Sequence, residues 1–528
     1  MSKQFVCFPM ELLKKNHESP VIAIEELCLS TVYNGTGGQP LWVTPDGPTI
    51  NAAIILSHLI NSYEEGLNPD NYKVKEMLAL WPLRSMGNLA KLDTLLTYNL
   101  VKYIHDVSHG QLKPHSADPA LFAEAGDENF DPLRTIEIVL ATLDLDKYLT
   151  DLPPSHSHYT SLRSALKKYR DLEASGGWQH IPEGKTMRPG DEDNRLLLVR
   201  ARLKKTGELA KDSVTPALFD DDLKDAVISF QRRYGLEQDG IIGIQTLTAM
   251  NIPPNELIDT IRVNMARWRW QAHDLGQRYI IVNIAGYNLK AFDGETAELD
   301  FPVIVGKEQH QTPVFSDRIK YLDFNPFWNI TPTIARNEDL PKLRKNPRYL
   351  VERNVRLFSS WQANASELDS TAIDWANVSK SQMSTYLLRQ DPGPWNALGK
   401  VKFVFPNHYS VYMHDTPTHD LFSRTTRNFS HGCIRVSNPL ALAVFALEGQ
   451  DGGWDREAVE EVFQQESRKV IRLSSPLPVH ITYQTTWVDK NGSINFNKDV
   501  YARDSKLYNA LFSGEIDSTT KRNELAHD

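Results

Sequence analysis

The stretch "HDTPTHDLFSRTTRNFSHGCIR", residues 414–435, carries the strongest chemical signal in the chain. It holds Cys433, one of three cysteines. A free thiol has a pKa of about 8.5, so a nucleophilic cysteine needs a base beside it at neutral pH. His414 ends a β-like run, "YSVYM", and a strand end can hold an imidazole rigidly. The pattern favours Cys433 as a nucleophile and His414 as its general base and acid.

The residues around Cys433 suit this chemistry. Gly432 leaves backbone amides open, so the N–H of Gly432 or Cys433 is expected to stabilise an oxyanion. Ser430 and His431 are polar supports beside the thiol. Arg435 is suited to a substrate carboxylate, because its guanidinium can grip both oxygens, although a structural salt bridge is an equal alternative.

Two other roles for the cysteine remain open at this point. A zinc site could use the thiol and the nearby histidines, but no pair of them has finger or HExxH spacing. These histidines are His408, His414, His419 and His431. The thiol could also be a small buried hydrophobe, yet its polar neighbours make a poor core. We therefore predict no metal at this site.

The composition sets wider limits. The chain has 528 residues, which suggests about three domains. Its 41% hydrophobic and 24% charged content is typical of a globular protein. The net charge of −9 and the lack of a basic stretch argue against a nucleic-acid partner. No apolar run reaches the roughly 18 residues that span a bilayer. Cys7 and Cys28 could pair or stay reduced.

The change from helical to β-like patterns along the sequence predicts a multidomain α+β protein. Helical periodicity dominates the first third, and short β-like runs such as "KVKFVFPN" and "CIRV" follow residue 254. In the small helical unit, Val227, Phe230 and Tyr234 should share one face. "NPLALAVFALEG" reads as a helix with Ser437 or Asn438 as its N-cap. The predicted parts are an N-terminal segment 1–29, a mostly helical domain 30–189, a small helical domain 190–254, a β-rich domain 255–490 with an insert at about 336–398, and a C-terminal tail 491–528.

These residues resemble a known family. Fifteen residues, 415–429, separate His414 from "SHGC", and this arrangement is similar to the signature of the L,D-transpeptidase (YkuD-type) catalytic domain. "VIVGK", "FNPFWNITPTIA", "YNGTGGQPLW" and "GGWQHIPEG" also look like the large, scaffold-bearing YcbB-type (LdtD-type) members. "FQRRYGLEQDGIIGIQTLTAMN" resembles a peptidoglycan-binding domain. The insert would be the family's substrate-capping subdomain, with Trp361, Trp375 and Trp395 as apolar anchors or core.

The resemblance implies 3→3 cross-linking of peptidoglycan through a thioester on Cys433, with tetrapeptide stems as donors. It implies no metal and no organic cofactor, and it makes carbapenems the expected inhibitors. Trp328 and Tyr412 join Arg435 as expected substrate-binding residues. The alternatives are an L,D-carboxypeptidase or wall-protein-releasing hydrolase on the same site, and a non-catalytic peptidoglycan-binding protein.

The implied substrate also sets the expected location and partners. Peptidoglycan lies outside the inner membrane, so we expect a periplasmic enzyme, with an inner-membrane anchor that this sequence does not display. Donor tetrapeptides imply a functional link to a D,D-carboxypeptidase and to glycan polymerases, in cell-wall synthesis and cell shape.

Overall fold

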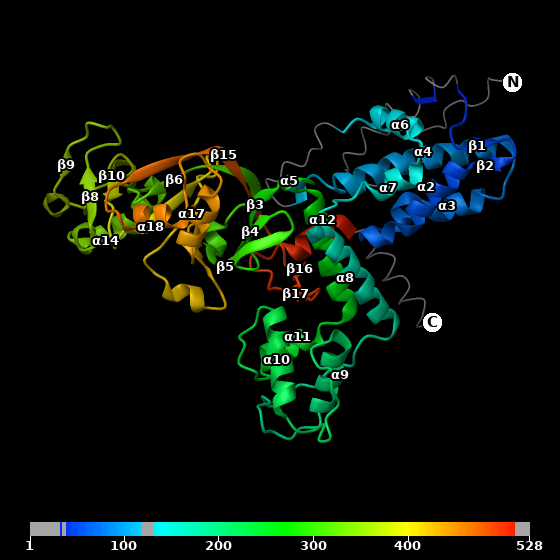
Figure 1. The fold of residues 1–528 in the computed structure, drawn as a ribbon, viewed down its shortest axis with the longest axis horizontal. Coiled ribbons are helices and arrows are strands. Elements are labelled where there is room, and N and C mark those ends of the chain that lie inside the picture. The colour runs from blue at the N-terminus through cyan, green and yellow to red at the C-terminus, as the bar shows by residue number, and fades with distance from the viewer. Residues whose placement is uncertain (1–31, 34–37, 118–129, 513–528) are drawn as a thin grey trace. The chain divides into compact units, whose positions relative to one another are not determined.

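The structure, a computed structural model, describes residues 32–33, 38–117 and 130–512. Cys7, Cys28 and the segment 1–29 lie outside the described residues. The chain forms two compact units, Met1–Asp274 with Tyr483–Asp528, and Leu275–Thr482. Figure 1 draws the helix-rich first unit and the β-rich second unit, which confirms the multidomain α+β class.

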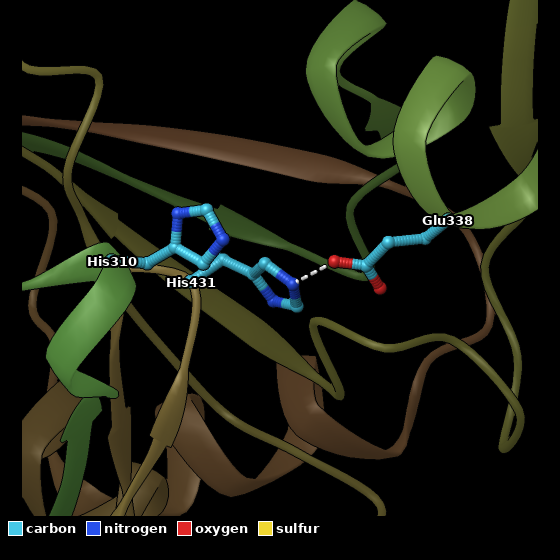
Figure 2. A group of neighbouring side chains, drawn as sticks. All are labelled: His310, Glu338 and His431. Atoms are coloured by element: carbon cyan, nitrogen blue, oxygen red, sulfur yellow. Dashed lines mark hydrogen bonds and ion pairs between the residues drawn. The ribbon is translucent and has the colours of Figure 1, made fainter.

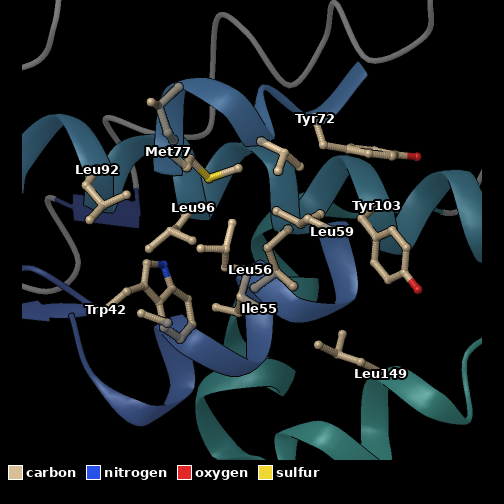
Figure 3. Close-up of a cluster of buried hydrophobic side chains, with 14 of the residues drawn as sticks. Trp42, Ile55, Leu56, Leu59, Tyr72, Met77, Leu92, Leu96, Tyr103 and Leu149 are labelled. Carbon is tan, nitrogen blue, oxygen red and sulfur yellow. The ribbon is translucent and has the colours of Figure 1, made fainter. Parts of the chain in front are cut away.

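The first unit begins with a helical bundle around one apolar core. Trp42, Ile55, Leu96 and Tyr72 are among its buried side chains (Figure 3). Thr49 caps the first long helix by accepting a hydrogen bond from the amide of residue 52. The elements are β1 (Val43–Thr44), β2 (Gly47–Pro48), α2 (Ile50–Ile60), η2 (Asn61–Glu65), η3 (Pro69–Tyr72), α3 (Val74–Leu80), α4 (Met86–Ser108), α5 (Pro114–Ala117), α6 (Pro132–Ala141), α7 (Leu145–Thr150) and α8 (Ser157–Ala174).

The small helical region follows, with α9 (Leu196–Thr206), α10 (Asp221–Arg233) and α11 (Ile244–Asn251). Val227, Phe230 and Tyr234 are all buried, which confirms their shared face. The rings of Phe230 and Tyr234 stack with centroids 4.2 Å apart. Asp220 caps α10 through the amide of residue 223, so local sequence and packing agree here.

The compact β-rich unit, Leu275–Thr482, is narrower at both ends than the predicted domain 255–490. Residues 254–269 form α12 (Pro254–Arg269), which packs along α8 in the first unit. The described part of the predicted tail, residues 491–512, contains β17 (Ile494–Phe496), which pairs with β16 (Thr486–Val488), and a helical stretch at residues 504–512. The side-chain amide of Asn264 on α12 donates to Thr485 Oγ1 at 2.8 Å. This contact shows why the C-terminal segment belongs with α12.

The second unit is built on nine strands in the order β13-β5-β14-β12-β11-β6-β15-β3-β4. Strand β5, the second in this order, also pairs with β4, the last, so the strands from β5 to β4 form a closed series of pairings. Helix α17 (Pro439–Leu447) begins at Asn438, whose side chain accepts from the amide of residue 441, and α18 (Arg456–Gln464) follows. The strands are β3 (Arg278–Asn283), β4 (Asn288–Asp293), β5 (Thr296–Gly306), β6 (Phe315–Phe324), β11 (Val401–Val404), β12 (Met413–His414), β13 (Asn428–Ser430), β14 (Ile434–Val436) and β15 (Lys469–Thr482).

An insert leaves the sheet after β6 and returns at β11. It has its own four-stranded sheet, in the order β7-β10-β8-β9, and its own core around Trp375. The exit and return points touch, because Phe324 pairs with Val401 in the main sheet. Its elements are β7 (Trp328–Ile330), α13 (Pro332–Ile334), η6 (Ala335–Asp339), α14 (Leu340–Leu343), α15 (Tyr349–Glu352), β8 (Val355–Phe358), β9 (Glu367–Leu368), η7 (Ser370–Ala372), α16 (Lys380–Met383) and β10 (Leu387–Gln390).

Candidate active site

Three adjacent strands bring the predicted site residues together. Lys402 of β11 pairs with His414 of β12, and His414 pairs with Arg435 of β14. Paired residues on neighbouring strands point to the same face, and so do residues two apart along one strand. Tyr412 precedes His414 by two residues, as Cys433 precedes Arg435. Lys402, His414 and Arg435 therefore share one face of the sheet, and Tyr412 and Cys433, which lie just before β12 and β14, are close enough to interact, since Tyr412 hydrogen-bonds to the thiol.

The thiol of Cys433 lies in the turn between β13 and β14, partly exposed and free of any disulfide. Its Sγ lies 3.8 Å from the carbonyl oxygen of Ser410. Burial raises the pKa of the Cys433 thiol, against hydrogen bonds from Tyr412 and the charges of Lys402 and Arg435. The resting thiol is therefore protonated at neutral pH, with donors and cations in place to stabilise a thiolate.

Ser430 holds the turn that carries the thiol. Its hydroxyl donates to the carbonyl of Cys433 at 2.5 Å and accepts from the amide of Gly432 at 3.1 Å. Gly432 has a φ of +112°, a conformation that side chains rarely adopt. Of the two amides expected to face an oxyanion, that of Gly432 already donates to Ser430. Among the described residues no acceptor meets the amide of Cys433, so this is the N–H left for an oxyanion.

His414 is held by its own neighbour. Its Nδ1 lies 2.5 Å from the carbonyl oxygen of Asp415, which fixes the proton on Nδ1 and leaves the lone pair on Nε2. The carboxylate of Asp415 is engaged elsewhere, accepting from the amides of Lys400 at 2.8 Å and Thr416 at 2.7 Å. Orientation of the imidazole therefore comes from a backbone carbonyl.

The electrostatics keep this imidazole neutral. Burial lowers the pKa of His414 to about 3, and the charge of Arg435 lowers it further than that of Lys402 does. The hydrogen bond to Asp415 opposes the shift. A neutral Nε2 can accept a proton from a thiol during attack, although its low pKa disfavours a preformed thiolate–imidazolium pair.

Two cations of the site lack carboxylate partners. Asp323 pairs with Lys402 in the sheet register, but its oxygens accept from Arg468 at 2.7 and 2.9 Å. Nowhere in residues 38–117 or 130–512 does a carboxylate form an ion pair with Lys402 or Arg435. Burial lowers the pKa of both groups. A buried charge without a partner is costly, so an incoming carboxylate would be stabilised here.

Lys402 and Ser410 were not anticipated from the sequence. Lys402 lies with its Nζ 3.6 Å from the centre of the Tyr412 ring. Its place in the alternating run "KVKFVF" is the signal that could have revealed it. Ser410 has a φ of +57°, which turns its carbonyl toward the thiol. Asn407 stabilises this turn by accepting from the amides of Tyr409 and Val411.

Not every predicted residue gathers at the thiol. Trp328 begins β7, pairs with Gln390 and packs against the core of the insert, and no described contact joins it to Cys433. Trp375 is buried in that core, whereas Trp361 and Trp395 are exposed. His431 lies close to the thiol in sequence, but its ring forms an ion pair with Glu338 of the insert.

Three segments of the chain match known protein families. Residues 277–453 match the L,D-transpeptidase catalytic domain family (YkuD), residues 28–166 a scaffold domain family, and residues 192–250 a family described as "Putative peptidoglycan binding domain". A Haemophilus influenzae protein named "Putative L,D-transpeptidase" is 32% identical over 228 residues. This match covers 43% of the chain and 45% of that relative, so less than half of its length is shared.

Solved structures of L,D-transpeptidases also match the chain, with low sequence identity and low TM-scores. A Xylanimonas cellulosilytica protein is 14% identical, with a TM-score of 0.19 over 57% of this chain and 99% of that one. A Stackebrandtia nassauensis protein is 11% identical, with a TM-score of 0.22 over 56% of this chain and 94% of that one. These scores carry no argument about the site, so the sequence matches decide the assignment.

The β-rich unit thus contains an L,D-transpeptidase catalytic domain of the YkuD family. The chain as a whole joins a scaffold domain, a peptidoglycan-binding-type domain and this catalytic domain, which confirms the family recognised in the sequence. Across the described helices, none combines the length and apolar character needed to cross a membrane.

Proposed function

We propose that this chain is a peptidoglycan L,D-transpeptidase that forms 3→3 cross-links, with Cys433 as nucleophile and His414 as general base and acid. The observation that supports the proposal is the pairing of β11, β12 and β14, which puts the oriented imidazole of His414 beside Lys402 and Arg435, the two cations whose charges act on the Cys433 thiol. A nucleophile beside a base and two cations suits acyl transfer from a substrate that bears carboxylates.

In the first half-reaction, Cys433 Sγ attacks the carbonyl carbon of the L,D bond between meso-diaminopimelate and the terminal D-Ala of a tetrapeptide stem. The thiol proton passes to His414 Nε2 as the S–C bond forms. The amide of Cys433 donates to the tetrahedral oxyanion. The C–N bond then breaks, His414 returns the proton to the leaving D-Ala amine, and a thioester remains.

In the second half-reaction, the side-chain amine of a second stem's diaminopimelate attacks the thioester carbon. His414 Nε2 takes the proton that this amine loses, the C–S bond breaks, and the thiolate takes the proton back. Arg435 and Lys402 bind a stem carboxylate, and Tyr412 donates to the sulfur while it carries negative charge. The insert favours transfer over hydrolysis to the extent that it excludes water from the thioester.

The wider setting follows from the same proposal. The substrate places the enzyme in the periplasm, beside the wall. The region matched at residues 192–250 would bind glycan or stem peptides. A D,D-carboxypeptidase that trims pentapeptides would supply the tetrapeptide donors, and glycan polymerases would supply the strands.

The direct test is incubation with purified tetrapeptide muropeptides, followed by mass spectrometry of the products. The expected product is a muropeptide dimer that has lost one D-Ala. The parent chain and the surface control Ser423→Ala should form it, and Cys433→Ala should not. Tripeptide products without dimers would show that the enzyme is an L,D-carboxypeptidase rather than a transpeptidase. The parent chain should also form an adduct with a carbapenem, detected by intact-protein mass spectrometry. If it neither converts the muropeptides nor forms this adduct, the chain is a binding protein and the proposal fails.

A further inference from the structure

A second group of side chains lies beside the active site and takes no part in the proposed reaction. It consists of His310, Glu338 and His431, whose nitrogen and oxygen ligand atoms all lie within 4.8 Å of one another (Figure 2). His310 ends the short helix η5 (Glu308–His310), Glu338 lies in η6 of the insert, and His431 lies in the turn before Cys433. Three separate segments of the second unit therefore converge on one point.

The spacing needs only a small contraction to hold a metal ion. Zinc bonds of about 2.0–2.1 Å in a tetrahedral site place ligand atoms roughly 3.4 Å apart. His431 Nε2 already contacts Glu338 Oε1, and the rings of His310 and His431 lie 5.2 Å apart between centroids. His310 and His431 are exposed and Glu338 is partly exposed, so side-chain rotation can close the gap and water can complete the coordination.

The backbones that carry the two imidazoles are tied together. The amide of Lys307 donates to the carbonyl of Ser430 at 3.0 Å, and the hydroxyl of Thr312 donates to the carbonyl of Gly432 at 2.8 Å. Gly306 lets the η5 turn approach, because a Cβ there would lie 2.0 Å from the carbonyl oxygen of His310. These bonds fix the positions from which both rings project, which is the preorganisation that a binding site requires.

The ion pair of His431 with Glu338 does not by itself account for the group. A simple latch between the insert and the turn would need only these two residues, and a second imidazole adds no favourable charge to it. Two imidazoles and one carboxylate are instead the ligand set of many three-residue zinc sites.

We propose that His310, Glu338 and His431 form a binding site for a divalent transition-metal ion of the zinc type. The bound ion would join the insert, through Glu338, to the turn that ends at Cys433. This site goes beyond the transpeptidase reaction and uses none of its residues. It also departs from our expectation of no metal here, because no sequence pattern links His310 and Glu338 to His431.

The test is zinc binding to the full chain with any affinity tag removed, measured by competition with a chromophoric chelator. The parent for this test carries Cys433→Ala, so that the thiol cannot serve as a rival ligand. We expect one zinc ion per chain, and at least about tenfold weaker binding in each of His310→Gln, Glu338→Gln and His431→Gln, since even outer-shell partners cost 10–100-fold. Matched controls are His408→Gln and Glu308→Gln, which lie outside the group and should bind as the parent does.

A second readout separates ligand loss from misfolding. Cobalt bound to the parent should give a visible spectrum of nitrogen and oxygen coordination, and the three variants should lose it while keeping the parent's circular dichroism. A parent that binds no zinc overturns the proposal. So does undiminished binding in the His310→Gln/Glu338→Gln double variant. Neither result bears on 3→3 cross-linking, which is measured on the chain with its thiol intact.

Discussion

His414 and Arg435 occupy paired positions on the parallel strands β12 and β14, and their side chains lie on the same face of the sheet. The guanidinium has no carboxylate partner among the described residues, and its charge helps to lower the pKa of the imidazole. One residue thus influences both substrate binding and the protonation of the base.

Replacing Arg435 by Gln should weaken donor binding. A lost hydrogen bond to a charged group costs about 1.5–3 kcal/mol, so we expect kcat/KM to fall roughly 10- to 100-fold, mainly through KM. Steady-state kinetics with tetrapeptide donors measure this. Arg472→Gln, on the exposed part of β15, is the control and should leave KM unchanged. A fall in kcat alone would instead assign Arg435 to the chemical step.

The imidazole of His414 should stay neutral far below the usual range. With a pKa of about 3, it should keep its neutral NMR shifts from pH 7 down to about pH 5, whereas an unperturbed histidine side chain titrates near pH 6.5. The sign for stability follows from linkage. Below about pH 6.5 the unfolded chain binds a proton at this residue that the folded chain does not, so stability falls as the pH drops toward 3. Full protonation of His414 at pH 5 would contradict the burial argument.

Loss of the Ser430 hydroxyl should loosen the turn at the thiol. Ser430→Ala leaves the buried amide of Gly432 without its acceptor, at a cost of about 1–3 kcal/mol. Urea unfolding should measure this loss as a lower free energy of unfolding. The rate at which the Cys433 thiol is alkylated should also differ between Ser430→Ala and the parent. Ser423→Ala removes a comparable hydroxyl on the exposed helix η8 (Asp420–Ser423) and should cost much less. Equal losses in the two variants would show that the turn does not depend on Ser430.

Ser410 offers a test of stored backbone strain. At a φ of +57° a side chain costs about 1–2 kcal/mol, so Ser410→Gly should be neutral or stabilising. The same change at Ser475, in β15 with an ordinary backbone, should destabilise by about 0.5–1 kcal/mol. Thermal unfolding of the pair decides the matter, and destabilisation of similar size at both positions would exclude relief of strain at Ser410.

The sequence made the chemistry easier to predict than the boundaries. The spacing of His414 from "SHGC" lies within one connected stretch, so pattern alone could link the pair. The hydrogen bond from the Gly432 amide to the Ser430 hydroxyl could not be predicted, because the rotamer of a hydroxyl side chain cannot be inferred from sequence. Residues 255–269 were predicted in the β-rich domain because α12 is helical in either case, and only its packing on α8 reveals that it belongs with the first unit. Lys402, Glu338 and His310 reach their sites through pairings between distant segments, which one sequence does not encode visibly.

The insert departs after Phe324 and returns before Val401, two residues that are paired neighbours in the main sheet. A further bond, from the amide of Asn325 to the carbonyl of Lys400 at 2.8 Å, closes its base. An excursion with such a narrow neck can be exchanged, enlarged or lost during evolution without shifting β6 or β11. The strands that flank the thiol and carry the imidazole can therefore stay fixed while natural selection reshapes the insert.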